Sequence, residues 1–218
     1  MKPKNLLIAC FLTWFFVTTA HAQWRPVNAD NFDVAGIKLG MSYEQAIKAA
    51  QTHFNLSNSD IKNQTRDEAA EMGLPSQLDN LIRRDMPMII HIKNGEEFIS
   101  MRFVRRAPPN EKDPAVLIKV SYSIPYTPQN LSAMKAAAIR KYGTPSAEAV
   151  IRGMNNVAWC PQPFRGNSRY VFACESSTHA SLVLNVGSGI HLELSDQGRY
   201  SQVTKKYEDS LKTTKPRF

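Results

Sequence analysis

Two amphipathic helix patterns, each followed by short strand patterns, limit most strongly how this 218-residue chain can fold. Ser42 and Gln45 have the spacing of a capping box, and apolar residues then recur at helical intervals. Thr127 and Pro128 start a second helix, because proline is favoured at the first helical position, and Gly143 suits its end. The order of helix, strands, helix and strands predicts an α+β domain, with helices packed on an antiparallel sheet.

A hairpin pattern gives the clearest strand prediction. Asn94-Gly95 separates two apolar runs, and this dipeptide favours a type I′ turn because both central residues need a positive φ. A further short helix is expected after Ser76, with Leu81 and Ile82 on one face. Because the helix-then-strands order occurs twice, we expect one domain over 23–218 with two similar halves, 23–124 and 125–218. Strands are expected at 88–93, 96–104, 115–124, 148–152, 156–160, 170–174, 181–186 and 190–194, and a terminal helix at 200–211.

Residues 1–22 have the three parts of a secretory signal peptide: a basic head, an apolar run and a small-residue cleavage pattern ending at Ala22. The apolar run is shorter than the ~20 residues that a membrane-spanning helix needs. We therefore expect cleavage after Ala22, a periplasmic or secreted bacterial protein, and no transmembrane span. Residues 7–10, LIAC, match the pattern of a lipobox that ends in Cys10. Most of the apolar run follows Cys10, however, which favours removal of this cysteine with the leader over its lipidation.

The charge of the mature chain is mildly basic. The formal net charge falls from +8 to +6 when Lys2 and Lys4 leave with the leader, which contains no acidic residue. This balance suits an anionic envelope component or a protein partner, although solubility alone also explains it. The basic residues are spread along the chain, which disfavours nucleic acid as a partner. The candidate basic surfaces are the pairs Arg83-Arg84 and Arg105-Arg106.

Removal of the leader leaves two cysteines, Cys160 and Cys174. An even pair in an oxidising compartment predicts a disulfide, which would close a loop of about 15 residues and contribute about 3 kcal/mol. Their spacing fits neither a CxxC motif nor a zinc finger, so a catalytic thiol or a metal site is disfavoured.

The loop between these cysteines is the candidate partner-binding surface. Trp, Tyr and Arg dominate the binding energy of protein interfaces, and a disulfide lowers the entropy lost on binding. The alternative is that Trp159 and Phe164 fill the core beneath the loop. The candidate contact residues are Trp159, Phe164, Arg165, Arg169 and Tyr170.

The stretch 36–46, GIKLGMSYEQA, resembles the opening of small bacterial envelope modules: the SmpA/OmlA outer-membrane assembly lipoproteins and the β-lactamase-inhibitor-protein-like fold. The segment 141–145, KYGTP, is similar to the helix ending in these proteins. The resemblance implies a helix packed on an antiparallel sheet and a binding or assembly role without catalysis. The chain departs from the pattern in its polar insert, 55–85, and in its lack of a lipid-anchor cysteine.

No nucleotide-binding motif or nucleophile elbow is present, and we expect no cofactor or metal. The sequence favours an exported, non-catalytic protein that binds a protein or an envelope component, with an inhibitor or immunity protein as a special case. The alternative is a hydrolase whose site is assembled from distant residues. Its first candidates are His191 and Glu193, which share one face of a strand, and it requires them to meet His179 and a Ser or Cys in a deep pocket. The sequence predicts no oligomeric state.

Overall fold

The computed structural model describes residues 25–57, 81–83, 86–87, 89–151, 154–161, 174 and 179–213. The expected signal peptide lies outside these residues, and so does the strand expected at 170–174 except for Cys174. So do the candidate contacts Arg84, Phe164, Arg165, Arg169 and Tyr170.

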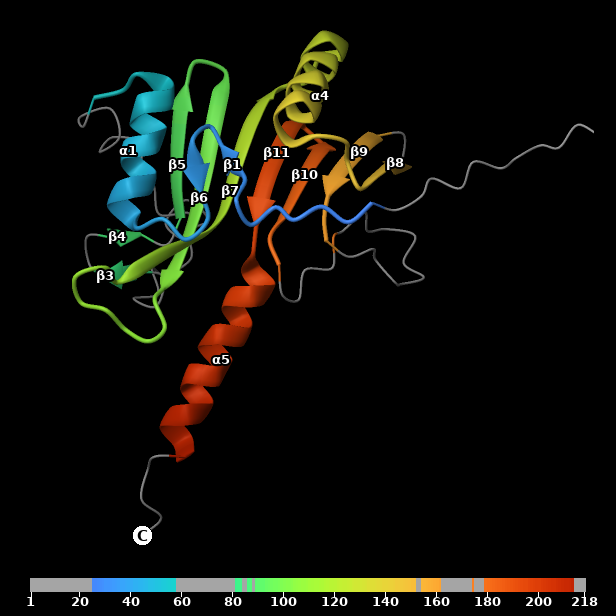
Figure 1. Ribbon diagram of the computed structural model, residues 1–218. Helices are drawn as coiled ribbons and strands as arrows, with labels where there is room; N and C mark the ends of the chain where they lie inside the picture. The colour runs from blue at the N-terminus through green and yellow to red at the C-terminus, as the bar shows by residue number, and fades with distance from the viewer. Residues whose placement is uncertain are drawn as a thin grey trace, which may run out of the picture.

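A seven-stranded antiparallel sheet forms the centre of the molecule, with the strand order β5-β6-β7-β11-β10-β9-β8 (Figure 1). The strands of the two sequence halves lie on opposite sides of the sheet, and β7 pairs with β11 where they meet. Two short hairpins, β1-β2 and β3-β4, lie outside the main sheet. The strands are β1 (Asp33–Val34), β2 (Ile37–Lys38), β3 (Leu81–Arg83), β4 (Met86–Pro87), β5 (Ile89–Asn94), β6 (Glu97–Arg105), β7 (Ala115–Pro125), β8 (Ala147–Ile151), β9 (Met154–Trp159), β10 (Ser181–Val186) and β11 (Gly189–Ser195).

Three helices complete the described fold: α1 (Tyr43–Phe54), α4 (Pro128–Tyr142) and α5 (Gln197–Thr213). α1 and α4 contribute to one hydrophobic core with the same face of the sheet. α5 follows β11 and extends away from the sheet (Figure 1). The α+β prediction is confirmed, but the helix expected over Leu81 and Ile82 is wrong, because these residues lie in β3, which pairs with β4. Within the described part of the chain, no helix has the length and apolar character of a membrane span.

The helix starts follow the predicted capping chemistry. The Ser42 hydroxyl accepts from the Gln45 amide at 3.2 Å, and the Gln45 side chain accepts from the Ser42 amide at 3.0 Å. At α4, the Thr127 hydroxyl accepts from the Asn130 amide at 3.0 Å. α1 therefore has two reciprocal capping bonds, whereas α4 has one.

The core lies between the sheet and the two helices. Ile99, Met101 and Phe103 alternate along β6 and have no exposed surface, as a strand with one buried face predicts. Phe54 of α1 and Met134 of α4 pack into the same cluster. Burial on one face of the sheet therefore joins both halves of the chain in a single core.

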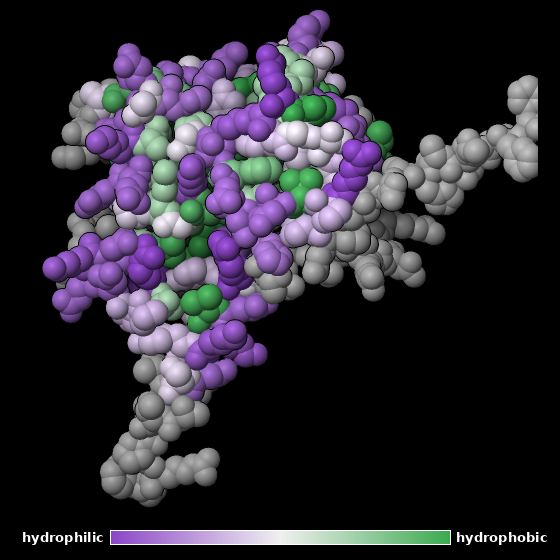
Figure 2. Space-filling model, in the orientation of Figure 1, coloured by the Kyte–Doolittle hydropathy of each residue, from purple (hydrophilic) through white to green (hydrophobic). Residues whose placement is uncertain are grey.

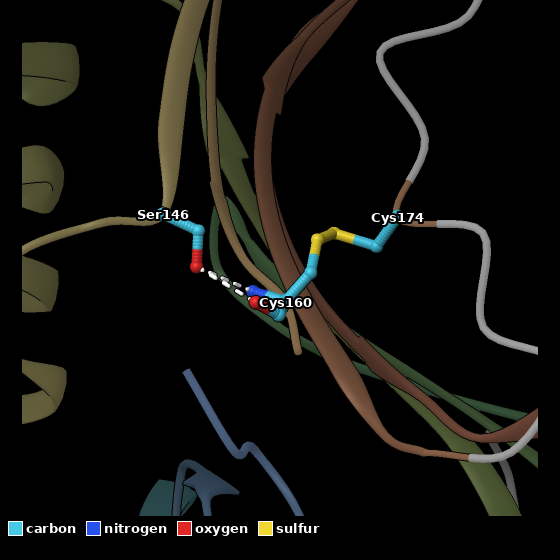
Figure 3. The surroundings of a disulfide bond; sticks show 3 residues. All are labelled: Ser146, Cys160 and Cys174. Carbon is cyan, nitrogen blue, oxygen red and sulfur yellow. Dashed lines mark hydrogen bonds between the residues drawn. A yellow bond between two sulfur atoms is a disulfide. The ribbon is translucent and has the colours of Figure 1, made fainter. Parts of the chain in front are cut away.

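The predicted disulfide joins Cys160, at the end of β9, to Cys174, with the Cα atoms 5.5 Å apart. The Ser146 hydroxyl donates to the Cys160 carbonyl and accepts from the Cys160 amide, both at 2.9 Å (Figure 3). The Val27 amide also donates to the Cys160 carbonyl at 2.9 Å. The disulfide is therefore anchored on a backbone segment that two separate parts of the chain, at Val27 and Ser146, hold in place.

Candidate binding groove

A groove of about 550 Å³ lies on the helix-bearing face of the sheet. One wall is α4, the opposite side is formed by the β1-β2 turn and the end of α1, and the floor is the sheet at β7 and β11. Apolar side chains on this face occur in small groups among hydrophilic ones (Figure 2). The lining residues are Val34, Ala35, Gly36, His53, Tyr122, Ile124, Asn130, Ala133, Met134, Ala137, Ala138, Lys141, Tyr142 and Leu192.

Small side chains on α4 create the space. Met134 and Ala138 point into the core, while Ala133 and Ala137 are exposed on the adjoining stripe of the helix. Residues four apart on a helix are neighbours on its surface, so the two exposed alanines make a continuous low wall. Lys141, another turn along this stripe, lies at the C-terminal end of the wall.

The floor is set by the pairing of β7 with β11, in which Tyr122 lies opposite Leu192. The ring of His53, from α1, contacts the Tyr122 ring edge-on, with the centroids 5.7 Å apart. Burial and the neighbouring Glu97 carboxylate raise the pKa of Tyr122 to about 12. Its hydroxyl is therefore neutral at physiological pH and is engaged with Glu97.

The β1-β2 turn is held against α4 by Asp33. Ala35 and Gly36 have φ values of 55° and 78°, as a tight hairpin turn requires. The Asp33 carboxylate accepts from the Gly36 amide at 2.9 Å and from the Lys141 ammonium at 2.6 Å, and the Tyr142 hydroxyl donates to the Asp33 carbonyl. Burial, followed by the Asp33 charge, raises the pKa of Tyr142. These contacts fix the width of the groove at this end.

The two residues proposed for chemistry lie on the other face of the sheet. His191 pairs across the strands with Ser123, and the Ser123 hydroxyl lies 2.7 Å from the His191 Nδ1 atom. Glu193 shares this face, as its spacing predicts, but its carboxylate pairs with Lys119 at 2.8 Å. A serine nucleophile needs a histidine that a carboxylate orients, and here the carboxylate contacts a lysine instead.

The histidines of the hydrolase alternative lie apart. His179 precedes β10 and is 3.8 Å from the Asp30 carboxylate, whereas His191 lies opposite Asn185 near the other end of that strand. The described residues do not bring His179, His191 and Glu193 into one pocket. The same part of the chain also contains no group of three His, Cys, Asp or Glu side chains that could hold a metal ion.

The predicted partner contacts are dispersed. Trp159 follows the alternative in which it fills the core, because it has no exposed surface and its indole N–H donates to the Gly143 carbonyl at 2.9 Å. The Arg106 guanidinium pairs with the Asp113 carboxylate across the β6-β7 connection. Arg105 is exposed at the end of β6, and Arg83 lies in β3. Trp159, Arg105 and Arg106 do not line the groove, and the groove itself was not predicted from the sequence.

Comparisons of the chain with protein-family models, curated proteins and solved structures found no match. The resemblance to SmpA/OmlA-type and β-lactamase-inhibitor-protein-like modules therefore stays a prediction.

Proposed function

We propose that this chain is an exported binding protein without catalytic activity, and that the groove between α4 and the β1-β2 turn receives an apolar group of an envelope component or protein partner. The observation that carries the proposal is an apolar groove of about 550 Å³, a size typical of ligand sites. Covering such a surface is favourable, at about 0.8 kcal/mol for each methylene removed from water.

The Cys160–Cys174 disulfide supports the exported part of the proposal, because such bonds persist in oxidising compartments. The expected leader supports it as well, since it predicts a mature chain that begins at Gln23. Sequencing of the mature N-terminus after expression with the leader tests this part. A start at Gln23 is expected, whereas a retained leader would contradict it.

The groove is tested by filling it. Ala137→Trp places a large side chain on the exposed wall of α4, and Ala136→Trp makes the same change at an exposed position outside the lining. The wild type and both variants are used to capture components from envelope extract, and native mass spectrometry identifies proteins and small molecules. We expect a component that the wild type and Ala136→Trp retain and Ala137→Trp loses. Equal recovery by all three would overturn the proposed function.

A further inference from the structure

We infer that the ligand of this groove is a single-chain anionic amphiphile, an aliphatic chain that ends in a carboxylate. The inference deepens the proposed function and rests on it. Three properties of the groove support it: the charge of its lining, the pairing of its polar groups and its volume.

The charge of the lining favours an anion. Among the described residues that line the groove, Lys141 carries a fixed positive charge, His53 is titratable, and none is an aspartate or glutamate. The Lys141 ammonium donates to the carboxylate and the backbone carbonyl of Asp33, at 2.6 and 3.2 Å. An ammonium has three donors, of which the bonds to Asp33 use two. The side chain is 46% exposed, and the ammonium also lies 5.3 Å from the centroid of the Tyr142 ring. A carboxylate at this end of the groove would complete its hydrogen bonding.

Three other polar side chains of the lining already have a partner in the fold, which favours an aliphatic ligand. The Asn130 side chain donates to the Pro125 carbonyl at 3.0 Å, the Tyr142 hydroxyl donates to Asp33, and the Tyr122 hydroxyl is engaged with Glu97. α4 and the sheet, which form one wall and the floor, have backbone groups that are paired within those elements. A sugar or an extended peptide would lose hydrogen bonds to water without replacing them, which is costly. An alkyl chain loses none.

The volume limits the size of the occupant. If each non-hydrogen atom takes about 30 Å³, the volume of one water molecule in the liquid, then 550 Å³ accommodates about 18 atoms. One medium-length alkyl chain with its carboxylate fits this volume, whereas a lipid with two long chains exceeds it. The probes are therefore single-chain compounds of one length.

The experiment compares head groups and wall variants. Dodecanoate, dodecan-1-ol and dodecyltrimethylammonium are titrated, below their micelle concentrations, into ¹⁵N-labelled mature protein, with NMR to locate binding and calorimetry to measure affinity. Ala137→Trp and its control Ala136→Trp test the wall. Lys141→Gln tests the charge, and Arg140→Gln, at an exposed neighbour outside the lining, is its control.

We expect dodecanoate to bind most tightly and to shift the amides of α4 and of residues 34–36. Ala137→Trp should weaken its affinity at least tenfold and Lys141→Gln about threefold to tenfold, with both controls unchanged. Lys141→Gln should weaken dodecanoate more than dodecan-1-ol, because only the carboxylate loses a charged partner. Equal affinity for dodecanoate and dodecan-1-ol would overturn the anionic assignment but leave the groove as an apolar site. If none of the three probes binds, the amphiphile inference is overturned. The proposed function would then stand if the capture experiment still recovers a component with the wild type and with Ala136→Trp but not with Ala137→Trp.

Discussion

α1 and α4 cover the same face of one sheet, but they relate to it differently. α1 packs its apolar stripe into the core and is closed by a reciprocal capping box. α4 packs a narrower stripe and leaves Ala133 and Ala137 exposed beside it, where they form the wall of the groove. Two helices with similar sequence patterns thus present different surfaces: α1 closes the core, whereas α4 leaves an exposed wall, which we propose as a binding surface. The buried residues are Ala46, Ala50 and Phe54 in α1, and Met134 and Ala138 in α4.

The largest test of this difference is a pair of core truncations. Phe54→Ala should lower the free energy of unfolding by about 3 to 5 kcal/mol, because it removes a buried ring from a closed core. Met134→Ala should cost less, about 2 kcal/mol, because the lost volume opens into the groove. Urea unfolding of both variants measures the two values. A larger loss for Met134→Ala would contradict the comparison.

Removal of the disulfide tests what stabilises the C-terminal half of the chain, 125–218. The double variant Cys160→Ser/Cys174→Ser should lose about 3 kcal/mol on the chain-entropy account. The unfolding of wild type in reducing buffer should match that of the variant, which serves as the control. If the variant and the oxidised wild type unfold at the same urea concentration, the disulfide has no stabilising role in this domain.

The helix caps give a smaller test. Ser42→Ala and Thr127→Ala should each cost about 1 kcal/mol, the usual value for loss of a capping hydroxyl. The double variant Ser42→Ala/Gln45→Ala should lose more than Thr127→Ala, because it removes both reciprocal bonds of the α1 cap, whereas Thr127→Ala removes one bond. Thermal unfolding, with Ser188→Ala in the exposed β10-β11 turn as a control outside the helices, ranks these variants. Equal or reversed losses would remove this part of the difference between α1 and α4.

The smallest effect is expected from ionisation of the Tyr122 hydroxyl, in the floor of the groove. Burial and Glu97 raise the pKa of Tyr122 to about 12. Because the pKa is raised on folding, this group stabilises the folded state fully below pH 10, its ordinary value, and the contribution is lost as the pH rises through about 12. Glu97→Gln should lower the pKa of Tyr122 while burial still holds it above 10. Ultraviolet titration of wild type and Glu97→Gln, each with Tyr122→Phe as the reference, measures the shift. An unchanged value would show that Glu97 does not act on Tyr122.

Local sequence chemistry predicted the elements well where the deciding residues are neighbours in the chain. The Asn94-Gly95 hairpin, the Ser42 cap and the Pro128 start all depend on spacings of a few residues, and all are present. The terminal helix begins at residue 197 rather than at 200. Asp196 comes just before it, is only 5% exposed and pairs with Arg199 in the first turn. An aspartate just before a helix is itself a start pattern, so this boundary could have been placed from the sequence.

The groove could not be predicted in the same way. Its floor depends on the pairing of Tyr122 with Leu192, and its end depends on the contact of Asp33 with Lys141, more than a hundred residues away in sequence. Ala133 and Ala137 do not look distinctive in the sequence, because alanine is common in helices and its exposure depends on how α4 sits on the sheet. Trp159 shows the converse: its residue type suggested an interface, while tertiary packing made it core.

The central claim is that the helix-bearing face of the sheet, rather than the face that carries Ser123 and His191, binds the ligand. The most direct measurement is an NMR spectrum of the ¹⁵N-labelled mature protein before and after exposure to envelope extract. The account predicts chemical-shift changes at residues 34–36, Ala133, Ala137 and Lys141. Changes confined to Ser123, His191 and their neighbours on the other face would contradict it.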